Sequence, residues 1–323
     1  MSRNLKRTFI ITSLVVFALI MSIGGSTASK KKIRLALSFH DPSCEWAQPM
    51  KSGVSDAAAE FGIDASFIGP TPIDAAKQIE QVNTLVEQNM IDGLAITAMD
   101  PSYKPLIDEL VKKGIPVVTV CNDDPTSKRL AFYGQPIEAI EQTAYEMTKK
   151  FCAETLKGKK GKIAILCALP EIKALTDRVE GSRRAIKEFP NLEALPGYYA
   201  KGQDINKCYA DIESLLSAHP DIVGLISTEA TTTPTAGHVV RGKGLQKKVH
   251  VAGYDVTKEC VELVSDGSID LLVGQFPYKQ GYLAMKALYD YLDKGIKPKS
   301  VDVGAEYITP KNVKPYLKSM GIK

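Results

Sequence analysis

The fold is decided by residues 33–61, which read IRLALSFHDPSCEWAQPMKSGVSDAAAEF. The first seven of these residues form a short apolar run of the kind that becomes a buried strand. After a polar loop, apolar side chains such as Met50, Val54 and Phe61 recur at helical spacing. A buried strand that leads into an amphipathic helix is the repeating unit of an α/β protein.

The same alternation continues almost to the end of the chain. Near-continuous apolar strands predict parallel sheets that helices cover on both faces. The pattern restarts after a long predicted helix, so we expect two doubly wound α/β lobes of similar plan. Strands are expected at residues 33–39, 65–68, 94–97, 116–121, 162–167, 222–227, 249–254 and 271–275. Helices are expected at residues 46–61, 74–88, 103–113, 137–156, 176–189, 205–218, 234–241, 257–265 and 278–294.

Residues 1–28 have the layout of a secretory signal peptide. A basic start is followed by an apolar run at residues 9–23 and then by small residues at 26–28. The alternative is a membrane anchor that is never cleaved, but the apolar run is shorter than the ~20 residues that span a bilayer. We therefore expect an exported, periplasmic protein with a cleaved signal peptide.

Composition argues against a nucleic-acid partner. The 323 residues carry a formal net charge of +4, and loss of residues 1–28 would lower it to +1. A nucleic-acid partner would need a concentrated basic face instead. The six cysteines match no zinc-binding spacing. We interpret Cys152, Cys167, Cys208 and Cys260 as buried thiols, and one disulfide somewhere in the chain is the alternative.

The sequence contains no complete motif for nucleotide binding or for catalysis. Residues 237–243 have the spacing of a phosphate loop, but Gly244 follows where Ser or Thr is needed. No Gly-x-Gly-x-x-Gly follows the first strand, and neither His-Glu-x-x-His nor Gly-x-Ser-x-Gly occurs. The sequence therefore predicts a protein that is not an enzyme, with no metal and no cofactor.

Five stretches resemble the periplasmic sugar-binding proteins of the ribose-binding type, which feed ABC importers. They are IPVVTV at 115–120, SKRLAFY at 127–133, LSAHPD at 216–221, VAGYD at 251–255 and GQFP at 274–277. The resemblance covers residues 32–310 and implies two lobes that close over a small polar ligand. Regulators of the lactose-repressor type share this fold, but a signal peptide and the lack of a helix-turn-helix exclude them here.

Three crossings near Gly134, Phe276 and Val303 are expected to form the hinge between the lobes. The N-terminal lobe is predicted to comprise residues 30–134 plus 277–299. The C-terminal lobe is predicted to comprise residues 135–276 plus 300–323.

The resemblance implies ligand-binding roles for four side chains. They are the stacking ring of Trp46, the guanidinium of Arg178, the carboxylate of Asp255 and the hinge-side amide of Gln275. The chain also departs from the family pattern, because Cys121 stands where a strand usually ends in Asp and Glu229 replaces a common Asn. Asn122 and Asp123 follow Cys121 at the same strand end and complete the predicted ligand-binding set.

The predicted charges favour a neutral ligand. Three carboxylates, at Asp123, Glu229 and Asp255, face one sure cation, and an uncompensated buried charge is costly. We therefore expect a neutral sugar or polyol first, an amino-bearing relative second, and a sugar phosphate or acid last. A monomer that passes this ligand to a membrane ABC permease is the main functional hypothesis. The alternatives are a sensory receptor that signals to a membrane kinase or chemoreceptor, and an exported α/β enzyme.

Overall fold

The computed structural model describes residues 32–319, and within them the strands form two six-stranded sheets. The first sheet has the order β11-β5-β4-β3-β1-β2, and all its neighbouring strands are parallel. Its strands are β1 (Arg34–Ser38), β2 (Asp64–Ile68), β3 (Gly93–Ile96), β4 (Val117–Val120), β5 (Phe132–Gly134) and β11 (Val301–Asp302).

The second sheet repeats this plan with the order β12-β10-β9-β8-β6-β7. Its strands are β6 (Gly161–Leu166), β7 (Leu192–Ala194), β8 (Ile222–Ser227), β9 (His250–Tyr254), β10 (Leu271–Gly274) and β12 (Glu306–Ile308). Only β12 departs from the parallel arrangement, because it runs antiparallel to β10. The prediction of two doubly wound α/β lobes is confirmed, with this antiparallel edge as the difference.

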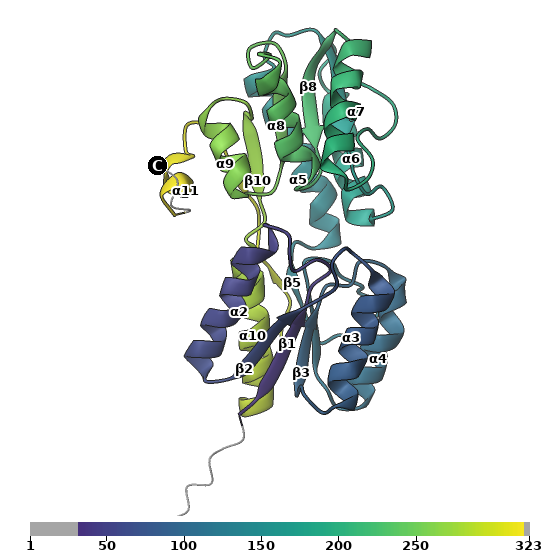
Figure 1. Ribbon diagram of the computed structural model, residues 1–323, viewed down its shortest axis with the longest axis vertical. Coiled ribbons are helices and arrows are strands. Elements are labelled where there is room, and N and C mark those ends of the chain that lie inside the picture. Colours follow the sequence, from purple (N-terminus) through teal and green to yellow (C-terminus); the bar gives the residue numbers. More distant parts are fainter. Residues whose placement is uncertain (1–31, 320–323) are drawn as a thin grey trace, which may run out of the picture. The chain divides into compact units, whose positions relative to one another are not determined.

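Helices cover both faces of the first sheet (Figure 1). On one face α2 (Ala47–Phe61) and α10 (Pro277–Lys294) pack against each other and against the strands. The buried side chains of α3 (Ala75–Glu87) and α4 (Lys104–Lys112) form a second core on the opposite face. A 3₁₀ turn, η1 (Pro101–Tyr103), leads into α4.

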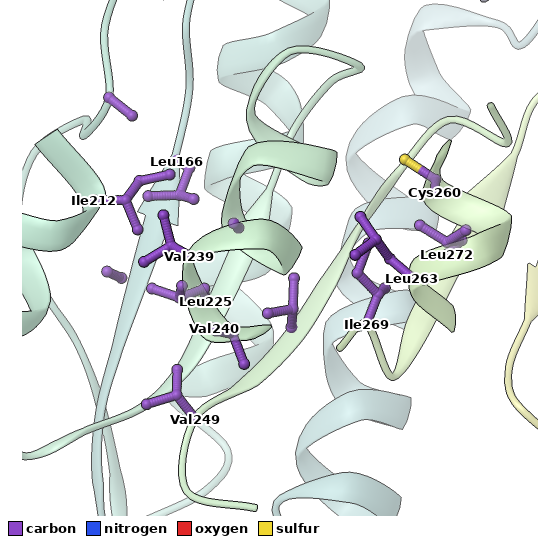
Figure 2. Packing of buried hydrophobic residues seen from close by; sticks show 14 of the residues in the cluster. Leu166, Ile212, Leu225, Val239, Val240, Val249, Cys260, Leu263, Ile269 and Leu272 are labelled. Carbon is purple, nitrogen blue, oxygen red and sulfur yellow. The ribbon is translucent and has the colours of Figure 1, made fainter. Parts of the chain in front are cut away.

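The second sheet is also covered on both faces. One core lies under α5 (Ile137–Lys150) and α6 (Lys173–Ile186), and α5 continues as a π-helical turn, η2 (Phe151–Thr155). The other lies under α7 (Ile205–Ala218), α8 (Thr232–Gly242) and α9 (Lys258–Ser265). Figure 2 shows this second core, where Leu166 and Leu225 from the strands meet Ile212 and Val239 from the helices. The last described helix is α11 (Lys314–Ser319).

The chain passes between the sheets at three places. The first lies between β5 and α5, the second between β10 and α10, and the third between β11 and β12. One boundary differs from the prediction, which gave residues 300–323 to the C-terminal lobe. Val301 and Asp302 pair with Tyr133 and Gly134 of the first sheet, so the last crossing begins after Asp302.

All six cysteines lie within residues 32–319, and all are free. Cys152, Cys167, Cys208 and Cys260 are buried, as predicted, while the alternative of a disulfide is not seen. In the same part of the chain, no cluster of His, Cys, Asp and Glu side chains is arranged to hold a metal ion.

The predicted signal peptide at residues 1–28 lies outside the described residues. From residue 32 to residue 319, none of the helices combines the length and the apolar character that a membrane span requires.

Candidate functional site

A cavity of about 180 Å³ lies where loops at the carboxyl ends of strands from both sheets meet. This is the place where open parallel sheets bind ligands. It is smaller than the roughly 300–1,000 Å³ of common ligand pockets, which suits a compact ligand. Seven of the eight predicted site residues line it: Trp46, Cys121, Asn122, Arg178, Glu229, Asp255 and Gln275.

Arg178 is a buried polar group of the cavity that several contacts hold in place. It projects from α6 and is only 6% exposed. One terminal nitrogen donates to the carbonyl of Thr228 at 2.6 Å and the other to the Gln275 amide oxygen at 2.6 Å. Its guanidinium carbon lies 3.9 Å from the ring centroid of Tyr254. Within residues 32–319 the buried Nε–H has no hydrogen-bond partner, so this donor is not used by the described part of the chain.

Asp255 follows β9 and is 5% exposed. Burial raises the pKa of its carboxyl to about 6, the Glu229 charge adds to the rise, and Arg178 opposes it. The amide of Gln275 donates a hydrogen bond to the carboxylate. Arg178, Gln275 and Asp255 therefore form one hydrogen-bonded chain, in which an amide links a cation to a carboxylate that is unusually ready to take a proton.

Trp46 belongs to the first lobe and contacts Asp255, the carboxylate of this hydrogen-bonded chain. Its ring is 8% exposed and stacks on Phe39, with centroids 5.5 Å apart and planes at 18°. A hydrogen bond from the Trp46 side chain helps to hold the pKa of Asp255 down. The neighbouring Glu45 accepts a hydrogen bond from the backbone N–H of Lys258 at 2.5 Å, at the start of α9. Both contacts join the two lobes beside the cavity.

Glu229 lines the cavity, but its carboxylate is already occupied by its own lobe. One oxygen accepts from the backbone N–H of Thr232 at 3.0 Å and from the same residue's hydroxyl. The other accepts from the Thr228 hydroxyl at 2.5 Å and from the backbone N–H of Ala168 at 3.4 Å. The two Thr232 donors lie at the start of α8, where a negative charge is favourable, and together the four donors satisfy the carboxylate.

Asp123 is the predicted site residue that does not line the cavity. Its carboxylate is held by Arg129, with nitrogen–oxygen distances of 2.5 Å to both of its oxygens, and by the Thr119 hydroxyl. It lines a smaller neighbouring cavity instead. Cys121 has a φ of +62°, and Cys121 and Asn122 line the main cavity while Asp123 lies outside its lining. The carboxylates to be compared with the Arg178 charge are therefore Glu229, Asp255 and Asp41, which lines the cavity, and Asp123 is not among them.

Sequence reasoning did not include His40 and Gln135 among the site residues. Burial lowers the pKa of His40 to about 4, so the ring is neutral, and its Nδ1 has no partner in the described part of the chain, residues 32–319. Gln135 lies in the first crossing; its amide nitrogen donates to Thr143, and its oxygen has no partner among residues 32–319. The signal for His40 was its place directly after the first strand. Gln135 carried none, because β5 is only three residues long.

Comparison with known proteins gives relatives along almost the whole chain. A xylose/arabinose-binding protein of Sulfolobus acidocaldarius is 26% identical over 285 residues, which cover 83% of this chain and 69% of the relative. A D-ribose/D-allose-binding protein of Pseudomonas aeruginosa is 22% identical over 318 residues, which cover 95% of this chain and 98% of the relative.

Solved structures share the fold. A periplasmic ABC-transporter solute-binding protein of Actinobacillus succinogenes with bound D-allose gives a TM-score of 0.80 at 22% identity and covers 88% of this chain and 100% of its own. A solute-binding protein of Burkholderia graminis in complex with D-arabinose gives 0.79 at 22% identity and covers 88% and 97%. A family model described as a periplasmic binding protein domain matches residues 35–297. Since that match spans most of the chain, the protein belongs to the periplasmic binding protein family.

Proposed function

We propose that this protein captures a small neutral sugar in the cavity between its lobes and delivers it to an ABC importer. The observation that carries the proposal is the chain Arg178–Gln275–Asp255 beside the ring of Trp46. A sugar offers hydroxyls that both donate and accept, and apolar C–H faces that suit an aromatic ring. The relatives named for xylose, arabinose, ribose and allose support this class of ligand.

Capture is proposed to work by closure of the lobes. The N-terminal lobe would comprise residues 33–134, 277–299 and β11, and the C-terminal lobe most of residues 135–276 with β12 and α11. A ligand favours the closed form because only closure brings Trp46 and the Arg178 chain into reach together. No bond of the ligand is made or broken in this scheme. The sensory alternative is not favoured, because the relatives with bound sugars are described as transporter proteins.

The charges of the cavity support a neutral ligand. Arg178 faces Asp255, Glu229 and Asp41, and two of these carboxylates are satisfied by nearby donors: Glu229 by α8, and Asp41 by Ser43 and Thr71. A ligand phosphate would meet acceptors that cannot donate to it. We also propose export by a signal peptide at residues 1–28, which N-terminal sequencing of protein from the periplasm would test, and a monomeric state.

The test is calorimetric titration and thermal unfolding with D-xylose, L-arabinose, D-ribose and D-allose, beside ribose 5-phosphate and xylonate. At least one neutral sugar should bind with micromolar affinity, about −8 kcal/mol. At a concentration of about 100 Kd it should add roughly 2.7 kcal/mol to the free energy of unfolding. The proposal fails if no neutral sugar binds, or if a phosphate or acid binds ten times more tightly than its neutral analogue.

A further inference from the structure

The shared plan of the two sheets places Cys121 and Asp255 in equivalent positions. Each follows the fourth strand of its half, β4 or β9, which lies between the third and fifth strands. Each has a positive φ, +62° for Cys121 and +78° for Asp255, and each lines the cavity. One backbone arrangement thus presents a carboxylate from the second half and a thiol from the first.

A second thiol lies on the same side. Cys44, in the loop after β1, lines the cavity, and its charged form would raise the pKa of Cys121. Burial raises the pKa of Cys44 to about 11 and that of Cys121 to about 12, so both are neutral thiols. A thiol is a weak donor and a weak acceptor. The side of the cavity formed by Cys44 and Cys121 therefore offers a sugar hydroxyl much poorer hydrogen-bond partners than the chain Arg178–Gln275–Asp255 does.

The border between the main cavity and the smaller one beside it combines apolar side chains with two amides around Cys121. Ile140 and Ala174, which line both the main cavity and the smaller one beside it, share that border with Cys121. The amide nitrogens of Asn122 and Gln135 at the same border donate to Thr97 and Thr143, and that of Asn122 also donates to the Cys121 sulfur at 3.6 Å. The sulfur is thus already engaged as an acceptor, and within residues 32–319 the Gln135 oxygen is the amide acceptor at this border that has no partner. No charged side chain within residues 32–319 is common to the linings of these two cavities.

We infer that the site prefers a deoxy sugar, whose edge against Cys44 and Cys121 carries hydrogen or methyl in place of a hydroxyl. The inference rests on the proposed function and specifies its ligand class. A hydroxyl buried against the thiols would give up its bonds to water and gain little in return. A methyl group there would leave water and lie on sulfur and on the side chains of Ile140 and Ala174.

The test is the affinity ratio within matched pairs: D-fucose and D-galactose, L-rhamnose and L-mannose, and 2-deoxy-D-ribose and D-ribose. In at least one pair the deoxy sugar should bind ten times or more tightly than its hydroxylated partner. If sugars bind but the hydroxylated member is equal or better in every pair, the inference is overturned while the proposed function stands. If no sugar binds, both fail.

Variants test whether the thiol causes the preference. Cys121→Asp puts a carboxylate on a backbone that Asp255 shows to be compatible with Asp, and it should reverse the ratio. Cys121→Ser, nearly the same size, should reduce the ratio at least threefold even if the Asp variant does not fold. Cys208→Ser is the matched control, because that thiol is buried beside Thr235 in α8 and does not line the cavity. A ratio unchanged in Cys121→Ser would overturn the inference.

Discussion

Arg178 is held from three directions before any ligand arrives: by the Thr228 carbonyl, by Gln275 and by the ring of Tyr254. A side chain fixed in this way would lose little conformational freedom on binding a ligand, which favours affinity. Lys could supply the charge but not the fork that makes these contacts at once.

We therefore expect Arg178→Lys to weaken sugar binding about 10-fold to 100-fold, by calorimetry with the sugar identified in the screen. The matched control is Arg129→Lys, which removes a similar fork from Asp123 away from the cavity. The control should lower the melting temperature with little change in affinity. Equal losses of affinity in both variants would refute a direct role for Arg178.

The raised pKa of Asp255 predicts how the stability of the folded protein changes with pH. Burial raises its pKa from 3.8 to about 6, so above pH 6 the folded protein contains a carboxylate that the unfolded chain solvates better. This charge lowers stability at neutral pH, and the cost disappears as the pH falls from 6 toward 4. Asp255→Asn should therefore gain stability relative to the wild type at pH 7.5.

Urea unfolding of ligand-free protein at a series of pH values checks this. The difference in unfolding free energy between variant and wild type should change by on the order of 3 kcal/mol between pH 7.5 and pH 4. His40 titrates in both proteins, so its effect cancels in the comparison. A difference that does not vary with pH would contradict the shifted carboxyl.

The candidate site could be predicted from strand ends and family pattern only in part. Asp255 and Gln275 are predictable because each lies in a stretch shared with the family, and Trp46 and Arg178 because the resemblance assigns ligand-binding roles to their positions; all four line the cavity. Asp123 also stands at a strand end, but it pairs with Arg129 outside the lining of the main cavity, and a strand-end position alone does not predict such an ion pair. The neutral state of His40 arises from burial, which depends on the assembled lobes.

At the scale of elements, glycines set how closely paired helices approach. A Cβ on Gly53 of α2 would lie 2.2 Å from the carbonyl oxygen of Tyr278 in α10, and one on Gly281 of α10 would lie 2.4 Å from the Met50 carbonyl oxygen. In the second lobe, a Cβ on Gly181 of α6 would lie 2.1 Å from the carbonyl oxygen of Glu141 in α5. Backbone atoms cannot move aside as side chains do, so these positions exclude even Ala.

Gly53→Ala should therefore destabilise the protein by about 2 kcal/mol or more, despite the higher helix propensity of Ala. Gly242→Ala is the control, because its added Cβ would meet only the Tyr209 hydroxyl at 3.0 Å, at the end of a side chain. Chemical denaturation of both variants gives the comparison. Gly242→Ala should change stability by less than about 1 kcal/mol, and an equal loss in both would contradict the packing argument.

Long elements were predictable and short ones were not. Residues 205–218 and 222–227 were predicted with the bounds that α7 and β8 have, because each is long enough to show its periodicity. Strands β5, β7, β11 and β12 contain two or three residues, which is less than a readable pattern. Each of these short strands is defined by the strand beside it, which is often distant in sequence.

At the scale of the whole molecule, Glu45 links the lobes without lining the main cavity. Its carboxylate accepts from the first N–H of α9, where a negative charge is favourable. Glu45→Ala should therefore weaken ligand binding about fivefold, corresponding to about 1 kcal/mol, mainly through faster dissociation. Stopped-flow release of the bound sugar measures the rate.

The control for this variant is Glu60→Ala. Glu60 accepts from Tyr282 between α2 and α10, so its contact stays within the first lobe. The bound sugar should dissociate from Glu60→Ala at the same rate as from the wild type. The same release rate in both variants would show that the Glu45 contact does not contribute to closure.

The three crossings determine which half of the molecule can complete its core first during synthesis. Strands β6 to β10 follow one another without interruption, so this half holds most of its core once residue 274 has been synthesised. The first half still lacks α10, which covers α2 and four strands, and it must wait for residues 277–294. In the full-length chain the first half depends on contacts between α10 and strands that are distant in sequence, and such contacts form slowly. We therefore expect β8 and β9 to be protected before β1 and β3 in pulsed hydrogen exchange during refolding. During synthesis the first half would stay incomplete until residues 277–294 have been added.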